Sequence, residues 1–244
     1  MTTPHKLGKL YLVPTNLTDT FAPSSILPND VISIALTIDH YIAENAKTAR
    51  AFLKAIGITR PLHEINIVEL DKHANQVVTD AAHQLLSPLL AGFDVALVSE
   101  AGAPAVADPG ALIVAAAHEA GIQVVPLVGP SSILLGLMAS GLNGQKFAFH
   151  GYLPQDKIAR IKAIAELERE SKQKNMTQMF IETPYRNAPL FNDLIVTLNP
   201  NTRLCVASNL TGSTERVQTH HVAQWRAQKA EIEKAPTLFL FLAP

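Results

Sequence analysis

The sequence predicts an α/β protein whose first half contains a largely parallel sheet. Short apolar runs alternate with longer helical patterns, and the strand-like segments of the first half are joined in β-α-β order. Of the 244 residues, 48% are hydrophobic and 17% are charged. This composition supports a large buried core and excludes disorder of the whole chain.

The elements of the first half follow from apolar runs and from the residues that end them. Pro14 ends the first strand, and Gly57 and Gly121 each end a helix. The run 31–42 is apolar nearly throughout, so its pattern fits both a helix and a buried strand. We expect strands at 9–13, 65–68, 93–98 and 124–128, and helices at 48–56, 75–90 (ending at Ser87 and Pro88), 111–120 and 132–139.

The second half begins after the segment 141–147, which has the glycine and asparagine content of a linker. A longer helix is expected at 158–174, with Ile158, Ile161, Ala165 and Leu167 near one face. The remaining expected elements are strands at 147–151, 179–181, 204–208 and 239–242, and a helix at 188–198. The break predicts two domains, 1–143 and 144–244.

Charge and cysteine content exclude several classes of protein. Twenty basic and 21 acidic residues give a net charge of −1, so no strong average attraction to nucleic acid or to an acidic membrane is expected. The segment 157–174 carries six basic and three acidic residues, which indicates a solvated helix face more than an RNA contact. Cys205 is the single cysteine, which excludes an intramolecular disulfide, and we expect it to be an inert core thiol.

Neither a membrane segment nor a metal site is expected. The first nine residues lack the apolar region of a secretory signal, and no run of about 18 apolar residues occurs. The nine histidines are scattered, and the adjacent His220 and His221 fit a solvated pair better than a metal site. We therefore expect a cytoplasmic protein.

Two loops at the ends of expected strands have the composition of ligand-binding segments. The loop 99–110 is rich in small residues and proline, which let a ligand approach the main chain closely. Its alternative interpretation is an ordinary turn in which Asp108 caps the next helix. The segment 128–132 similarly opens a helix that Ser131 or Ser132 could cap, and Ile133 excludes a serine-hydrolase elbow there.

A third segment, 182–186 (ETPYR), follows an expected strand. Glu182 and Arg186 could form a surface ion pair, or they could be polar groups that line a cleft between the two halves. Neither a P-loop nor a G-x-G-x-x-G dinucleotide loop occurs in the chain.

These segments, in this order, resemble the tetrapyrrole methylase superfamily of S-adenosylmethionine-dependent methyltransferases. Within it the chain is most similar to the ribosomal RNA small subunit methyltransferase I branch. The matching segments are 10–15 (LYLVPT), 43–45 (AEN), 97–102 (LVSEAG), 108–110 (DPG), 125–131 (VPLVGPS), 139–142 (ASGL) and 182–186 (ETPYR).

The resemblance implies two α/β domains with S-adenosylmethionine in a cleft between them, and commonly a homodimer. Matched by position, the implied cofactor-binding residues are Pro14, Ser99, Ala101, Gly102, Asp108, Pro109, Ser131, Ser132, Thr183, Asn209, Leu210, Pro236 and Thr237. Glu182, Tyr185 and Arg186 are the candidate catalytic residues on the acceptor side.

Several positions depart from the branch pattern. The branch usually reads E-D-T-R at 44–47, S-D-A-G-T-P at 99–104, E-S-P-H-R at 182–186 and A-R-E-L-T-K at 207–212, whereas this chain reads ENAK, SEAGAP, ETPYR and ASNLTG. Some changes remove charges, and phosphate contacts supply much of RNA affinity. The departures therefore weaken the expectation of an RNA substrate more than that of a cofactor site.

Three functions follow. The first is a methyltransferase that modifies ribosomal RNA, as a 2′-O-methylation of 16S RNA in the 30S subunit. The second is the same chemistry on a tetrapyrrole or another small molecule, which the near-zero net charge favours. The third is a module that binds S-adenosylmethionine or S-adenosylhomocysteine without catalysis.

Overall fold

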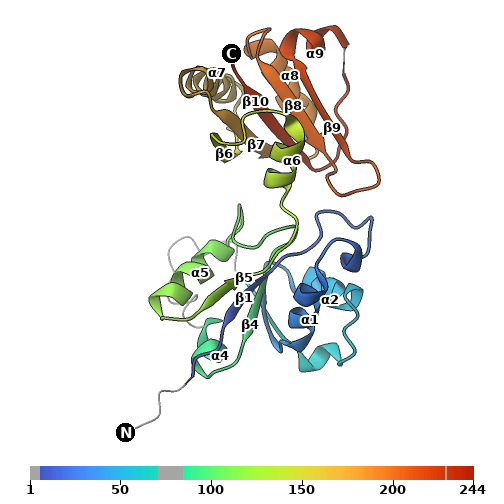
Figure 1. Cartoon of the computed structure of the whole chain (residues 1–244), viewed down its shortest axis with the longest axis vertical. Coiled ribbons are helices and arrows are strands. Elements are labelled where there is room, and N and C mark those ends of the chain that lie inside the picture. Colours follow the sequence, from blue (N-terminus) through green and yellow to red (C-terminus); the bar gives the residue numbers. More distant parts are fainter. Residues whose placement is uncertain (1–5, 71–84, 229) are drawn as a thin grey trace. The chain divides into compact units, whose positions relative to one another are not determined.

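The computed structural model describes residues 6–70, 85–228 and 230–244. The chain divides into two compact units, Met1–Ser131 and Ser132–Pro244 (Figure 1). The division precedes α6 (Ser132–Ser140), whereas the sequence suggested a boundary after residue 143. The helix groups with the second unit because Gly136 packs against Leu238, which a Cβ at Gly136 would approach to 2.4 Å.

The first unit contains a five-stranded sheet in which all the described pairings are parallel. The order of its strands is β3-β2-β4-β1-β5. This confirms the predicted parallel sheet and its four expected strands. The strands are β1 (Leu10–Val13), β2 (His40–Ala43), β3 (Asn66–Glu69), β4 (Val95–Val98) and β5 (Val124–Pro126).

The run 31–42, whose pattern fitted both a helix and a buried strand, contains part of each. It contains most of α1 (Asn29–Thr37), then two extended residues, then the start of β2. Tyr41 fixes the junction, because its buried hydroxyl donates a hydrogen bond to the carbonyl oxygen of Ala35 in α1. Helix and strand are thereby packed together within a dozen residues.

The other helices of the first unit agree with the sequence except around Pro88. Asn45 caps α2 (Ala46–Ala55) by accepting hydrogen bonds from the main-chain N–H groups of Lys47 and Thr48. Most of the expected helix 75–90 lies outside the described residues. Ser87 and Pro88 were expected to end it, but they begin α4 (Ser87–Leu90), since proline is tolerated in the first turn of a helix. The remaining helices are α5 (Gly110–Glu119) and the 3₁₀ turns η1 (Pro23–Ser25) and η2 (Leu62–Glu64).

Each face of the first sheet has its own apolar core. Leu10, Ile42 and Leu97 pack against α5 on one face. Val13, Tyr41 and Val98 belong to the cluster that contains α1 and α2 residues, on the other face (Figure 1). Because successive strand residues point to opposite faces, sheets covered on both sides require continuous apolar strands.

The second unit contains a mixed sheet of order β6-β7-β10-β8-β9. Strands β6 and β7 are parallel, and the other pairings are antiparallel. The strands are β6 (Phe147–Tyr152), β7 (Thr177–Glu182), β8 (Arg203–Ser208), β9 (Arg216–His221) and β10 (Thr237–Leu242). The four expected strands are confirmed, and β9 was not predicted.

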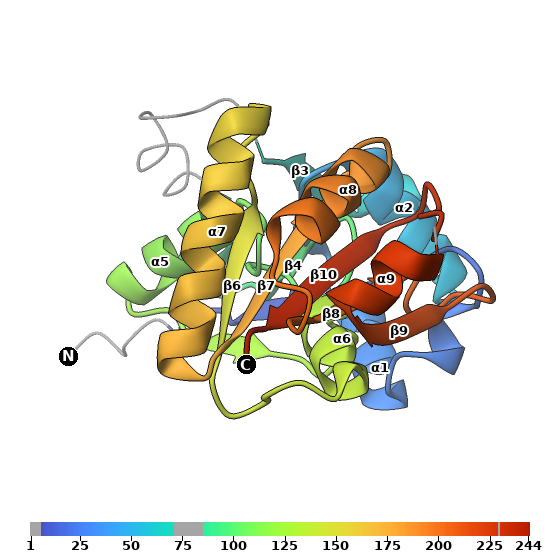
Figure 2. The ribbon, with the colours of Figure 1, turned by 90° about the horizontal axis from the view of Figure 1, so that it is seen from above.

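Helices α7 (Lys157–Lys174), α8 (Asn187–Thr197) and α9 (Val222–Gln228) lie across one face of this sheet (Figure 2). Their core contains Phe180, Phe191, Phe239, Phe241 and Trp225. The indole N–H of Trp225 donates to the carbonyl oxygen of Leu204 at 2.8 Å. Among the described helices, none is long and apolar enough to cross a membrane.

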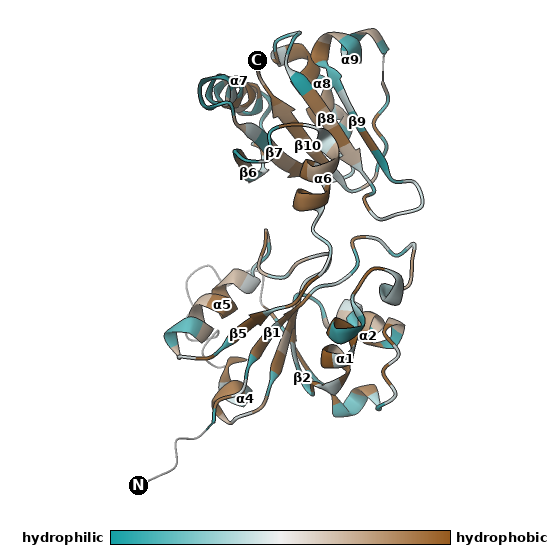
Figure 3. Cartoon of the chain, viewed as in Figure 1, coloured by the Kyte–Doolittle hydropathy of each residue, from teal (hydrophilic) through white to brown (hydrophobic). Residues whose placement is uncertain are grey.

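The predicted apolar face of α7 is partly wrong. Ile158 and Ala165 are exposed, and the buried residues are Arg160, Ile164 and Ser171. Arg160 is buried because its Nε and Nη2 donate to Oδ2 of Asp193 in α8, at 2.8 and 2.6 Å. Most of the helix surface is hydrophilic (Figure 3).

Candidate functional site

The predicted cofactor residues of the first unit lie at one edge of its sheet. Pro14 follows β1, Ser99 follows β4, and the segment 127–131 follows β5. The carboxyl ends of parallel strands meet at a common edge, where ligands of open α/β sheets bind. The fold therefore brings together three loops that are far apart in the sequence.

Gly102 is the point at which these loops make contact. Its main chain pairs with Thr15, with N···O distances of 3.0 and 3.2 Å in the two directions. A Cβ at Gly102 would lie 2.9 Å from Cδ2 of Leu17 and 3.2 Å from the carbonyl oxygen of Pro130. Its φ of +77° also disfavours any other residue.

Gly129 makes a second close approach, which the sequence reasoning missed. A Cβ there would lie 2.3 Å from both Cβ and Cγ of Pro14. The predicted residue Pro14 is buried by this contact and by its neighbours. The only sequence signal for this close approach was the presence of a glycine between Val128 and Pro130.

Asp108 organises the loop between β4 and α5. Its Oδ1 accepts hydrogen bonds from the N–H groups of Ala105 (3.0 Å) and Gly110 (2.6 Å). Burial raises the pKa of this carboxyl, the same two hydrogen bonds lower it, and the nearby Glu44 raises it. These contacts agree with the capping interpretation, and cofactor binding by Asp108 stays a prediction.

Ser99 and Ala101 belong to the same loop. The hydroxyl of Ser99 donates to the carbonyl oxygens of Ala101 and Gly102, at 3.4 and 3.3 Å. Oε1 of Glu100 accepts a hydrogen bond from Thr48 at 2.7 Å, which ties the loop to α2. Pro109 directly precedes α5, and Ser131 is partly buried at the end of the unit.

The predicted residues of the second unit gather at one edge of the mixed sheet. Because β10 is antiparallel to β7 and β8, its first residue lies beside their last residues. Thr237 is thus in register with both Glu182 and Ser208. The hydroxyls of Ser208 and Thr237 are 3.0 Å apart, and the N–H of Asn209 donates to the carbonyl oxygen of Pro236 at 2.9 Å.

Glu182 and Arg186 form an ion pair, but it differs from the surface pair that was one of the two predicted outcomes. Nε and Nη2 of Arg186 donate to Oε1 of Glu182 at 2.9 and 2.6 Å, and the N–H of Thr183 donates to the same oxygen at 2.6 Å. The Glu182 side chain is 1% exposed and that of Arg186 is 31% exposed. The pair is therefore not a surface pair. Tyr185, the third candidate, is exposed.

Asn187 holds the segment before β10, and no sequence pattern marked it. Its Nδ2 donates to Ala235 O (2.7 Å), Thr237 Oγ1 (3.1 Å) and Glu233 O (3.3 Å). Its Oδ1 is buried without a hydrogen-bond partner among the described residues. Ser132, at the start of α6, and Leu210, which is buried, are the remaining predicted positions in this unit.

Both edge clusters have features of a site for an organic ligand. The glycines at 102 and 129 let the loops of the first unit pack against one another more closely than side chains would allow. Buried polar atoms that have no hydrogen-bond partner among the described residues occur nearby, on Asn16 and Thr18 in the first unit and on Thr211 in the second. Within the described residues, no group of three or more His, Cys, Asp or Glu side chains is placed to hold a metal ion.

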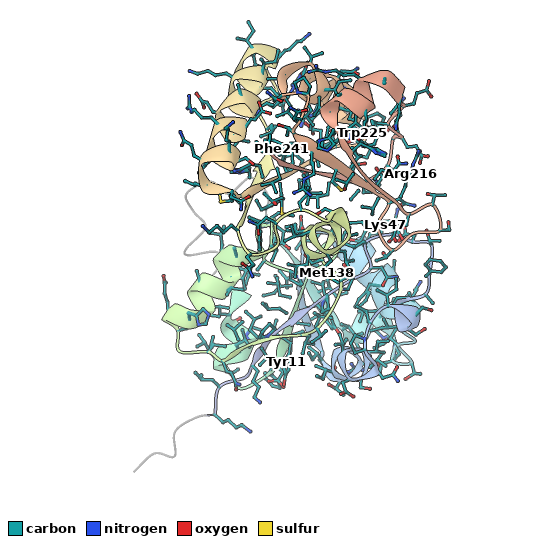
Figure 4. The ribbon with its side chains drawn as sticks, turned by 45° about the horizontal axis from the view of Figure 1, so that its top comes forward. Tyr11, Lys47, Met138, Arg216, Trp225 and Phe241 are labelled. Atoms are coloured by element: carbon teal, nitrogen blue, oxygen red, sulfur yellow. The ribbon has the colours of Figure 1, made fainter. Side chains whose placement is uncertain are left out.

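A cavity of ≈ 170 Å³ lies next to this edge of the second unit and is lined in part by Ser208 and Glu233. None of the predicted site residues lines it. Figure 4 labels Arg216 and Trp225, which contribute to its wall. The lining residues are Val206, Ser208, Arg216, Gln218, Trp225, Ala230, Glu231, Ile232 and Glu233.

Curated proteins of one name are similar to this chain over most of its length. The ribosomal RNA small subunit methyltransferase I of Xylella fastidiosa is 35% identical over 82% of this chain and 69% of its own length. Proteins of that name from Vibrio cholerae and Escherichia coli O157:H7 are 30% and 31% identical. They align with 98% and 93% of this chain and with 78% and 73% of their own lengths. No family model matches the chain.

Solved structures share the fold at low sequence identity. The methyltransferase CobJ has a TM-score of 0.61 and 16% identity, over 97% of this chain and 94% of its own. A conserved hypothetical protein from Aeropyrum pernix K1 has a TM-score of 0.66 and 15% identity, over 98% and 85%. Uroporphyrin-III-C-methyltransferase from Thermus thermophilus has a TM-score of 0.54 and 17% identity, over 96% and 92%.

The two sheets thus have the fold of solved methyltransferases such as CobJ and uroporphyrin-III-C-methyltransferase. The curated relatives show that the chain is a methyltransferase. The predicted fold class is confirmed. Within this class, the family follows from the 30–35% identity to relatives, which covers more than two thirds of this chain and of each relative. The chain belongs to the ribosomal RNA small subunit methyltransferase I family.

Proposed function

We propose that this protein transfers a methyl group from S-adenosylmethionine to ribosomal RNA, as a 2′-O-methylation of 16S RNA in the 30S subunit. The observation that carries the cofactor part is the convergence of three loops on Gly102 and Gly129 at the carboxyl edge of the first sheet. The RNA part rests on the names of the relatives. A cytoplasmic homodimer is part of the same proposal.

The residues at the two edges fit S-adenosylmethionine. Its adenine, hydroxyl and amino-acid groups need hydrogen-bond partners at close range, and glycine-lined main chain supplies these without side-chain bulk. In the first unit, Pro14, Ser99, Ala101, Gly102, Asp108, Pro109 and Ser131 would hold it. In the second, Ser132, Thr183, Asn209, Leu210, Pro236 and Thr237 would do so. When bound, the cofactor supplies an electrophilic methyl group.

The chain's own task is to align the acceptor hydroxyl with the methyl group, and the proton released on transfer passes to solvent. Alignment of the reacting atoms lowers the barrier to an in-line displacement. Oε1 of Glu182 already accepts three hydrogen bonds, so we assign Glu182 to positioning Arg186. Arg186 and Tyr185 have the more exposed side chains of the three candidates and are proposed to contact the acceptor.

Calorimetric titration with S-adenosylhomocysteine tests the cofactor part. We expect saturable binding near micromolar Kd, equivalent to about −8 kcal/mol, and its loss in Ser132→Trp. Folding of the variant is checked by circular dichroism. Absence of binding to the folded wild-type protein would contradict the proposed cofactor site.

Methyl transfer to defined acceptors tests the substrate. Cofactor with a labelled methyl group is incubated with 30S subunits that lack the modification, with free 16S RNA and with a tetrapyrrole. We expect label in the RNA of 30S subunits. Label in the tetrapyrrole alone would establish the small-molecule alternative, which the net charge of −1 favours. Cofactor binding without transfer to any of these acceptors would contradict the proposed activity.

A further inference from the structure

Two exposed tyrosines lie at the candidate-site edge of the second sheet. Tyr152 ends β6 and is in register with Ile181, the next-to-last residue of β7. Tyr185 lies just beyond the end of β7, in a turn closed by a hydrogen bond from Arg186 N to Thr183 O (2.9 Å). Their exposed fractions are 56% and 81%. Single exposed apolar side chains are ordinary, but here two aromatic residues are exposed near the same ends of adjacent strands.

Cations flank this pair. Nζ of Lys234 is 6.0 Å from the ring centroid of Tyr185, a distance at which a cation interacts with the face of the ring. Lys234 reaches this edge because it shortly precedes β10, whose first residue pairs with Glu182. Lys157 begins α7 a few residues after Tyr152 and is exposed.

The charges at this edge largely cancel, because the exposed Asp156 directly precedes Lys157. Arg186 is paired with Glu182, and the exposed Glu233 neighbours Lys234 in the sequence. Attraction to phosphate alone would therefore be weak. Exposed aromatic rings beside a few cations fit a different contact, which is stacking on the π-face of an unpaired nucleobase.

We propose that Tyr152 and Tyr185 form a stacking platform that holds unpaired nucleobases of the RNA substrate, with Lys234 contacting the adjacent phosphate. The inference rests on the proposed function and specifies how the acceptor is recognised. Sequence-specific contacts to RNA commonly use unpaired bases stacked on aromatic side chains, because paired bases expose little of their faces. The proposal therefore implies that the RNA segment bound at these tyrosines is single-stranded.

Equilibrium binding of RNA, measured without methyl transfer, tests the platform. The probe is a fluorescent 12-nucleotide oligoadenylate in low salt, compared with an abasic oligomer of the same length and with a 12-base-pair RNA duplex. Stacking of one base on an aromatic side chain contributes about 1–3 kcal/mol, so Tyr185→Leu should weaken oligoadenylate binding about 5- to 150-fold. Tyr152→Leu should weaken it similarly, and neither variant should alter abasic-oligomer binding by more than about twofold.

Two matched variants separate stacking from loss of structure. Tyr185→Phe keeps the ring and should bind oligoadenylate within about twofold of wild type. Phe147→Leu removes an exposed ring from the opposite end of β6 and should also have no effect. Unaltered binding by Tyr185→Leu, an equal loss for the abasic oligomer, or no oligoadenylate binding by wild type would each overturn the platform.

The outcomes also separate this inference from the proposed function. If Tyr152→Leu and Tyr185→Leu methylate 30S subunits with unchanged KM, the platform is wrong and the methyltransferase assignment stands. If wild type binds oligoadenylate through both tyrosines but transfers no methyl group to RNA, the platform stands and the proposed activity is wrong.

Discussion

Arg186 donates two hydrogen bonds to a single oxygen of Glu182, at 2.9 Å from Nε and 2.6 Å from Nη2. The carboxylate is almost fully buried, whereas the guanidinium is partly exposed. The arginine thus satisfies the buried charge and at the same time keeps part of its own surface in contact with solvent. It also directly precedes α8, so the pair fixes the turn that carries Tyr185.

Replacing Arg186 by methionine should destabilise the second unit. The change leaves the Glu182 carboxylate buried with only the Thr183 N–H as its remaining described partner. Removal of one member of a buried pair costs about 3–5 kcal/mol, and partial exposure of the arginine reduces this to about 1–3 kcal/mol. Urea unfolding of the variant measures the loss. Glu182→Gln combined with Arg186→Met should recover part of it, and an additive double variant would contradict the coupling.

Gly129→Ala should disrupt the candidate cofactor edge. The new methyl group would overlap Pro14, so the loop after β5 must move. We expect at least a tenfold weaker Kd for S-adenosylhomocysteine and a loss of about 1–3 kcal/mol in unfolding free energy. Gly144→Ala is the control, because nothing lies within 4 Å of a Cβ there. Equal affinities for the two variants would show that the loop after β5 does not form the site.

Asp108 gives a pH-dependent prediction. Asp108→Asn keeps an Oδ1 acceptor for the main chain of residues 105 and 110, whereas Asp108→Ala leaves both donors without it and should cost about 1–3 kcal/mol. The folded pKa is raised, so the folded state holds the proton longer than the unfolded state. The stability of wild type relative to Asp108→Asn should therefore fall as pH rises from the ordinary carboxyl pKa through the higher folded value. Urea unfolding at several pH values measures the difference in unfolding free energy between wild type and Asp108→Asn. A difference that does not change with pH would contradict the prediction.

Cys205 should be unreactive in the folded protein. Burial raises the pKa of its thiol from 9.0 to about 11, although a hydrogen bond with Thr219 lowers it. We expect no alkylation by iodoacetamide at pH 8 until urea unfolds the chain, because the thiolate is the reactive form. As pH rises, the thiol ionises at lower pH in the unfolded chain than in the folded protein. The contribution of Cys205 to stability is therefore complete below pH 9 and is lost between about pH 9 and 11. Cys205→Ala should lack this component, and rapid labelling of the folded wild type would contradict the burial.

The sequence predicted strands from their apolar runs and missed β9, which has no such run. Strand β4 is buried at all four residues, and its pattern is unambiguous. Strand β9 (RVQTHH) lies at the edge of the second sheet and has no apolar run, so periodicity could not find it. Likewise, Arg160 reads as a surface residue of α7, and only its pairing with Asp193, 33 positions later, explains why it is buried.

The candidate site was predicted where loop composition and family resemblance agreed. Gly102 stood in a loop whose small residues already indicated a close contact. Gly129 and Asn187 were missed because their roles depend on distant partners: Pro14 for the first, and carbonyl groups 46 and 48 positions later for the second. Such pairings are set by the folded topology and leave no local pattern.

The position of β1 between β4 and β5 in the first sheet has a consequence for synthesis of the chain. Its neighbours β4 and β5 are made much later, and Lys9 hydrogen-bonds a residue 85 positions further on. At about 5–20 residues per second, this apolar strand waits roughly 4–17 s for its first partner. The unit of β2, α2 and β3 is complete before then and can form a nucleus. Strand β1 therefore stays an unpaired apolar segment, open to aggregation or to a chaperone, until β4 is made.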